Sequence, residues 1–114
     1  MRRMSCAMTK EAVIARQKTV TRRKGWTMAK VGDRLHLVTK TMGLKKGETA
    51  DTLGYVEIVD IRREPLSELT ADDVEREGYP GMRPDEFIRR FFEPQGIRPS
   101  DFVTRIEWRY IEAP

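Results

Sequence analysis

The sequence of 114 residues contains one cysteine, Cys6, and one histidine, His36, and only 8% of its residues are aromatic. A single cysteine forms no internal disulfide and no cysteine-based metal site, which fits a reducing cytoplasm. The single histidine lies within a predicted strand, where we expect a structural or exposed residue, so we do not expect the usual hydrolytic triad of serine, histidine and aspartate. No apolar run approaches the ~18 residues of a membrane-spanning helix, and the basic segment 1–8 lacks the apolar stretch of a signal peptide. We therefore expect a cytoplasmic protein without membrane contact, metal site or cofactor.

Positive charge is concentrated at the beginning of the chain. Residues 1–46 contain 13 Lys and Arg against two acidic residues, a net charge of +11. Residues 47–114 contain nine Arg against 16 acidic residues, a net charge of −7. The basic segment favours a polyanionic partner, because phosphate contacts release counterions and dominate such affinities. The alternative is that the two halves of the chain neutralise each other within the fold, and composition alone leaves both interpretations open.

The length suits one compact domain over residues 1–114. Three segments have the pattern of strands. Apolar and polar residues alternate in 34–39 and again in 102–110, and 55–61 is rich in β-branched residues. Glycines between about 40 and 53 predict a polar loop.

Three short helices are predicted around these strands. Thr9 is placed to cap the first, and Thr70 with Asp73 resembles a capping pair for the second, which Gly78 would stop. The third begins at Pro84, and its phenylalanines recur at helical spacing, which places them in the core. Strands interspersed with short helices, without regular βαβ spacing, predict a small α+β fold around a curved or closed sheet.

The basic segment contains two residues that could act together. Lys18 and Thr21 are three residues apart, so they share a face only if the chain turns between them. A threonine becomes a nucleophile when a base takes its proton. Lysine is such a base if burial and neighbouring cations lower its pKa from ~10.4 toward neutrality. The alternative is a solvated surface loop without catalytic function.

The same segment has the residue types of a nucleic-acid contact. Arginine binds phosphate through its guanidinium fork, and an indole offers a face on which a base stacks. The candidate contacts are Arg16, Arg22, Arg23, Lys24 and Trp26, with Lys40, Lys45 and Lys46 extending the positive surface. In the alternative interpretation the tryptophan is a core residue, and the cations are solvated or pair with the acidic second half.

A family resemblance adds to these patterns. The Lys-Thr-Val-Thr-Arg-Arg run at 18–23, with Gly-Trp at 25–26 and Gly-Asp at 32–33, resembles an ASCH domain (activating signal cointegrator homology) of the PUA-like superfamily. Met-Thr-Lys-Glu-Ala at 8–12 and Glu-Arg-Glu-Gly at 75–78 extend the likeness over nearly the whole chain. The chain is most similar to the compact bacterial and phage members. The resemblance implies a PUA-like β-barrel with short flanking helices, and RNA or a modified nucleotide as ligand.

The resemblance also implies candidate chemistry. Some small members remove the acetyl group from N4-acetylcytidine with a lysine, a threonine three residues later and a distant glutamate, which correspond here to Lys18, Thr21 and Glu77. By analogy Thr21 attacks the acyl carbon, Lys18 accepts its proton and Glu77 assists proton transfer. Ribonuclease activity has been proposed for other members. The resulting hypotheses are an RNA- or modified-nucleotide-binding module, an amidohydrolase acting on acylated nucleosides, a ribonuclease, and an adaptor whose basic face binds an acidic protein.

Overall fold

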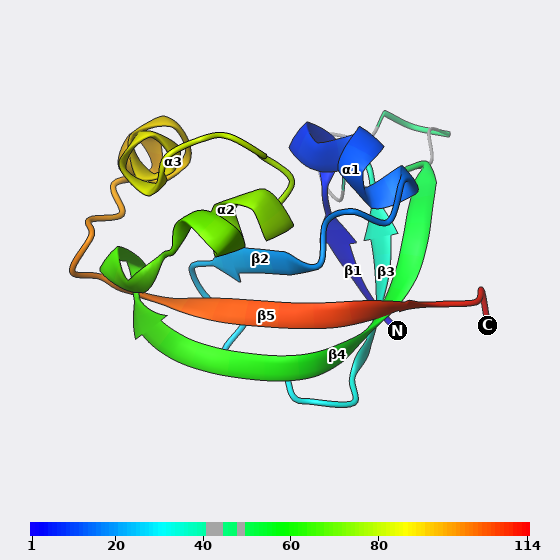
Figure 1. Cartoon of the computed structure of the whole chain (residues 1–114). Helices are drawn as coiled ribbons and strands as arrows, with labels where there is room; N and C mark the ends of the chain where they lie inside the picture. Colours follow the sequence, from blue (N-terminus) through cyan, green and yellow to red (C-terminus); the bar gives the residue numbers. More distant parts are fainter. Residues whose placement is uncertain (41–44, 48–49) are drawn as a thin grey trace.

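The structure is a computed structural model that describes residues 1–40, 45–47 and 50–114 (Figure 1). Within these residues five strands form one sheet in the order β1-β3-β4-β5-β2. The strands are β1 (Arg2–Ser5), β2 (Val20–Arg23), β3 (Arg34–Val38), β4 (Thr52–Pro65) and β5 (Phe102–Ile111). Strands β1 and β3 are parallel, and the other neighbours are antiparallel. The two edges of the sheet are therefore β1 and β2.

Short helices connect these strands, and their ends follow the predicted capping signals in part. The α-helices are α1 (Lys10–Ile14), α2 (Ala71–Arg76) and α3 (Pro84–Phe91), and the 3-10 turns are η1 (Ala7–Thr9), η2 (Leu66–Glu68) and η3 (Glu93–Gln95). At α2, the Thr70 hydroxyl accepts a hydrogen bond from the Asp73 amide at 3.2 Å, as predicted. Thr9 precedes α1, but its side chain makes no capping hydrogen bond. The α1 helix is correspondingly short.

Strand β4 gives the sheet its curvature. It is 14 residues long, extends beyond the predicted 55–61 at both ends, and pairs with both β3 and β5. The register with β5 shifts between Ile58 and Asp60, so Val59 forms a bulge. A bulge bends its strand and increases the local twist. The sheet consequently curls into a half-barrel, and the three helices lie over one side of it (Figure 1). The predicted α+β fold around a curved sheet is confirmed.

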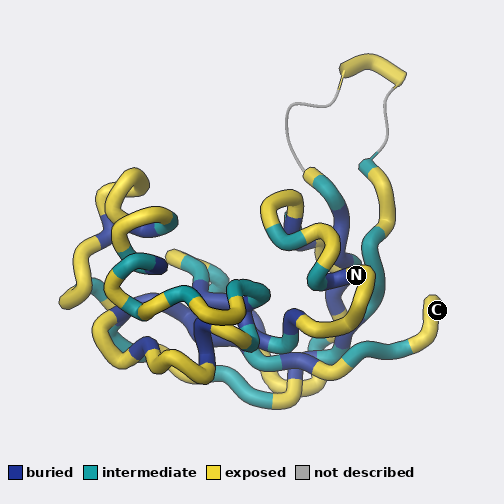
Figure 2. Tube along the Cα trace, turned by 45° about the horizontal axis from the view of Figure 1, so that its top comes forward, coloured by how far each residue is buried: buried dark blue, intermediate teal, exposed yellow. Residues whose placement is uncertain are grey.

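The apolar interior has two parts, and β5 contributes to both. Buried segments lie toward the middle of the trace, and the outer turns of the helices are exposed (Figure 2). Ile106 and Trp108 belong to the larger cluster between β3, β4, β5 and α1. Val103 belongs to the second cluster, where Phe87 and Phe92 are buried as predicted. Successive residues of a strand point to opposite faces, so Val103 lies on the other face of β5 from Ile106 and Trp108, and β5 is buried on both faces. In the described part of the chain, no helix has the length and apolar character to span a bilayer.

Candidate functional site

A pocket of about 470 Å³ lies between the end of β1, strand β2 and helix α3. β1 and β2 are the two edge strands of the half-barrel, and residues of both line the pocket. The polar lining includes Lys18, Thr21, Arg22, Arg23 and Glu77, and the aromatic lining is Trp26, Tyr79, Phe87, Phe91 and Phe92. The three residues that the resemblance assigned to catalysis thus line one pocket.

The chain turns directly before Lys18, between α1 and β2. Helix α1 ends at Ile14, and Arg16 adopts a left-handed conformation with φ of 60°. The amides of Gln17 and Lys18 both donate to the Ala12 carbonyl, at 2.8 and 3.2 Å. These bonds reverse the chain just before β2 begins. The Lys18 side chain is therefore directed into the fold instead of into solvent.

Two side chains of β5 hold the backbone of Lys18 in place. Its carbonyl accepts hydrogen bonds from Trp108 Nε1 at 2.9 Å and from the Tyr110 hydroxyl at 2.5 Å. The Lys18 Nζ donates to the backbone carbonyl of Glu77 at 2.7 Å, and the residue is only 4% exposed. Burial lowers the pKa of Lys18 below its ordinary value, although the Glu77 carboxylate acts in the opposite direction. A lysine whose pKa is lowered has a larger neutral fraction and is better suited to accept a proton.

Thr21 lies in the middle of β2, opposite Ile106 of β5, and is 2% exposed. Its Oγ1 accepts a hydrogen bond from Arg23 Nε at 3.1 Å. The same guanidinium donates through Nη2 to the Ser5 carbonyl at 2.7 Å and approaches Cys6 Sγ at 3.8 Å. Arg23 thereby links the two edge strands across the pocket.

Glu77 caps the C-terminal end of α2, directly before Gly78, whose φ is 109°. Its carboxylate accepts from the Arg22 amide at 3.3 Å and from Arg22 Nη1 at 3.2 Å. Burial raises the pKa of Glu77, while the positive charges of Lys18 and Arg22 act to lower it. The Thr19 amide donates to the Arg76 carbonyl at 2.8 Å and holds the end of α2 against the start of β2.

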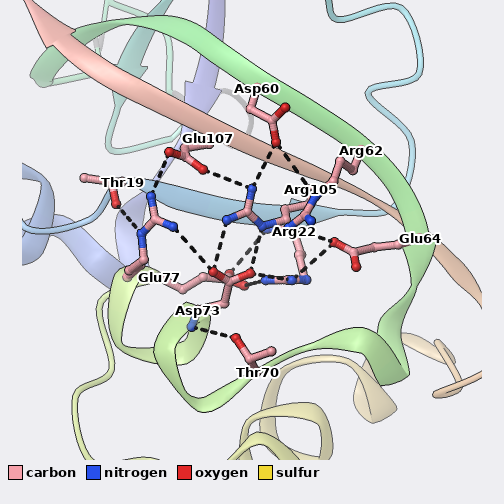
Figure 3. A network of polar contacts seen from close by, with 11 residues as sticks. Thr19, Arg22, Asp60, Arg62, Glu64, Thr70, Asp73, Glu77, Arg105 and Glu107 are labelled. Atoms are coloured by element: carbon pink, nitrogen blue, oxygen red, sulfur yellow. Dashed lines mark hydrogen bonds and ion pairs between the residues drawn. The ribbon is translucent and has the colours of Figure 1, made fainter.

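Arg22 belongs to an interior ion-pair network that borders the pocket at Glu77 (Figure 3). Its Nη2 lies 2.6 Å from Asp73 Oδ2 and 3.4 Å from Glu64 Oε1, and its side chain is 1% exposed. Arg105 of β5 binds the same aspartate through Nε at 2.7 Å and Nη2 at 3.1 Å. Arg22 thus pairs with acidic residues from the second half of the chain, which is the alternative to a nucleic-acid contact. We therefore place it in the interior network and not among the surface contacts.

The other predicted nucleic-acid contacts separate into two groups. Lys24 is exposed and borders the pocket, and Trp26 is half-buried at its edge, where the ring packs on the core and stacks with the Arg2 guanidinium 4.2 Å away. Three lysines and one arginine are exposed and do not line the pocket: Arg16, Lys40, Lys45 and Lys46. Arg16 lies over the Tyr110 ring, with its guanidinium carbon 5.6 Å from the centroid.

Several pocket residues were not predicted from the sequence. Ser5, Cys6 and Tyr79 line the pocket, and no local pattern marks them. Phe91 was predicted as core; it is half-buried and also lines the pocket. The described residues contain no group of three or more His, Cys, Asp or Glu side chains that could hold a metal ion.

No family model and no curated protein matches the chain, but solved structures do. An ASCH domain from Lactobacillus crispatus JV V101 matches with a TM-score of 0.64 at 15% identity, over 90% of this chain and 70% of that one. A protein from Enterococcus faecalis V583, described by the family model DUF984, matches with a TM-score of 0.62 at 14% identity, over 90% and 66% of the two chains. An ASCH protein from Zymomonas mobilis matches with a TM-score of 0.59 at 15% identity, over 95% and 64%.

These matches show that the chain has the fold of ASCH domains, as the resemblance implied. The chain covers about two thirds of the length of those structures, between 64% and 70%. One fold carries several functions, so the function depends on the side chains of the pocket.

Proposed function

We propose that the pocket binds the base of a nucleotide, either a modified nucleoside or an unpaired base of RNA. The observation that carries the proposal is the combination of an aromatic lining with a buried polar end in one pocket of about 470 Å³. This volume is typical of small-molecule sites. Stacking on an aromatic side chain contributes roughly 1–3 kcal/mol per base.

The polar end of the pocket suits the edge of a base. Lys18 Nζ is a donor, the Glu77 carboxylate is an acceptor, and the Thr21 hydroxyl is both. All three residues are 4% exposed or less. A ligand that leaves one of its own donors or acceptors unpaired beside them would therefore bind much more weakly. Lys24, which is exposed at the border of the pocket, is the residue we assign to a phosphate.

Calorimetric titration with nucleosides, nucleotides and short single-stranded RNAs tests this proposal. We expect Phe91→Ala to weaken binding about tenfold or more, because the ring is half-buried in the pocket wall. Phe102→Ala is the matched control, since Phe102 is 56% exposed and does not line the pocket. With Lys24 as the main phosphate contact, raising the salt from 50 to 200 mM should weaken RNA binding only about threefold. Equal affinities in wild type and Phe91→Ala would contradict the proposal.

A second candidate is an amidohydrolase acting on an acylated nucleoside. The specific observation that favours it is Lys18, which is buried, has a lowered pKa and shares the pocket with Thr21. In this reaction the Thr21 oxygen attacks the amide carbon and its proton passes to Lys18. The C–N bond then breaks, and the departing amine takes the proton from Lys18. Water hydrolyses the threonine ester, which releases a carboxylic acid and restores the hydroxyl.

Incubation with a panel of acylated nucleosides, followed by mass spectrometry, tests this second candidate. We expect Lys18→Met and Thr21→Val to abolish turnover while circular dichroism shows folded protein. Thr19→Val is the matched control, because this threonine lies in the same run and does not line the pocket. Turnover that persists in Thr21→Val would refute the mechanism. The ribonuclease and adaptor hypotheses stay predictions.

A further inference from the structure

We propose that Arg23 is a further catalytic residue, which orients the hydroxyl of Thr21 and stabilises the oxygen when it loses its proton. This inference rests on the hydrolase candidate. Residues two apart on a strand lie on the same face, so β2 places Thr21 and Arg23 side by side. Arg22, between them, directs its guanidinium to the ion-pair network. The motif spacing drew attention to Lys18 and Thr21, whereas the strand geometry adds Arg23.

The hydrogen bond between Arg23 and Thr21 has a fixed direction. A guanidinium only donates, so Arg23 Nε uses a lone pair of Thr21 Oγ1 at 3.1 Å. The hydroxyl has a single proton, and this bond leaves that proton available for a base in the pocket. When the proton departs, the same N–H faces an alkoxide, and a hydrogen bond to an ionised oxygen is shorter and stronger.

Arg23 forms no ion pair within the described part of the chain. Its described contacts are neutral atoms: Thr21 Oγ1, the Ser5 carbonyl and Cys6 Sγ. Arg22, the preceding residue, has three carboxylates around it instead. The bond to Ser5 at 2.7 Å anchors the guanidinium to the other edge of the sheet, so it is held in place before any substrate binds. Donors positioned in advance are the main means by which sites stabilise developing negative charge.

The same charge acts on the proposed base. Beside burial, which lowers the pKa of Lys18, the Glu77 carboxylate raises it and Arg23 lowers it. Arg23 therefore favours the neutral amine that can receive the proton of Thr21. One guanidinium serves the nucleophile and the base together.

Reaction with p-nitrophenyl acetate between pH 6 and 10, with intact-mass analysis of the acyl-enzyme, tests the inference without knowledge of the natural substrate. In the wild type we expect acylation of Thr21 that is absent in Thr21→Val. Arg23→Gln should acylate about 100-fold more slowly, which is the effect of losing one oxyanion donor. Its rate profile should also move to higher pH, and carbon NMR of labelled lysine should show a raised Lys18 pKa.

Two further variants separate hydrogen bonding from charge and from stability. Arg23→Lys keeps the charge, so it should restore the pKa of Lys18 while the acylation stays slow. Arg63→Gln is the matched control, because Arg63 Nη1 donates to Thr104 Oγ1 at 2.7 Å outside the pocket, and its rate should equal that of wild type. A wild type in which Thr21 does not react refutes the hydrolase candidate and this inference together. A reactive wild type with an equally reactive Arg23→Gln, or full recovery of the rate in Arg23→Lys, refutes the inference alone.

Discussion

Replacing Asp73 by alanine removes the carboxylate that joins two buried arginines (Figure 3). Asp73 Oδ2 lies 2.6 Å from Arg22 Nη2 and 2.7 Å from Arg105 Nε, and the three side chains are between 1% and 6% exposed. Breaking a buried ion pair by removing one partner costs about 3–5 kcal/mol. Arg22 would keep Glu77 at 3.2 Å and Arg105 would keep Glu107 at 3.1 Å. We therefore expect a loss in this range, and not twice as much.

Thermal and urea unfolding measure this loss. A domain of about 100 residues shifts its Tm by about 4 °C or more per kcal/mol, so the Tm of Asp73→Ala should fall by at least about 12–20 °C. Asp85→Ala is the control, since its side chain is 66% exposed and pairs with the exposed Arg83. The control should change the free energy of unfolding by less than about 0.5 kcal/mol. An Asp73→Ala protein within 1 kcal/mol of wild type would refute the reasoning.

The same network predicts a pH dependence. Burial acts to raise the pKa of Asp73, but the hydrogen bonds from Arg105 and Arg22 outweigh it and hold the pKa far below the usual range. In the unfolded chain the pKa of an aspartate is ~3.9. The stability that this carboxylate contributes is therefore complete well above pH 4 and is lost progressively as the pH falls further. The difference in unfolding free energy between wild type and Asp73→Asn should shrink below pH 4. A constant difference down to pH 2 would contradict this assignment.

Three further substitutions test Lys18 and contacts next to the pocket. Lys18→Met should unfold at the same or a higher temperature than wild type at pH 7, because the lowered pKa of the buried lysine means that wild-type stability increases as the pH rises toward ~10.4. A Tm that does not rise with pH in wild type would contradict this. Gly78→Ala should lower the free energy of unfolding in urea by about 2 kcal/mol more than Gly81→Ala. Both glycines have a positive φ, but only at Gly78 would the added Cβ lie 3.2 Å from the side chains of Ala12 and Thr9. Tyr110→Phe should lower the unfolding free energy by about 1 kcal/mol through loss of its hydrogen bond to the Lys18 carbonyl, and an unchanged Tm would count against that bond.

Local sequence signals predicted those helix ends and strands that depend on residues close together in the chain. The Thr70 hydroxyl caps the amide three residues later, and Pro84 begins α3 as expected. Strand β4 is longer than its β-branched segment, because pairing with β5 continues to Pro65. The bulge at Val59 has no local signature, since it depends on the register between two strands.

From the sequence alone one could predict the three α-helices, the strands β3, β4 and β5, the basic character of the first 46 residues, and the run that contains Lys18 and Thr21, because each depends on residues close together in the chain. The edge strands β1 and β2 were not predicted. The sequence could not distinguish Arg22 from Arg23, which are adjacent and chemically identical. The tertiary structure decided this: α2 brings Asp73, 51 residues away, against Arg22, while the end of β1 offers Arg23 only neutral acceptors. Burial and charge pairing depend on which distant segments meet, so only the folded sheet distinguishes the arginine that pairs with buried carboxylates from the one that binds the Thr21 hydroxyl.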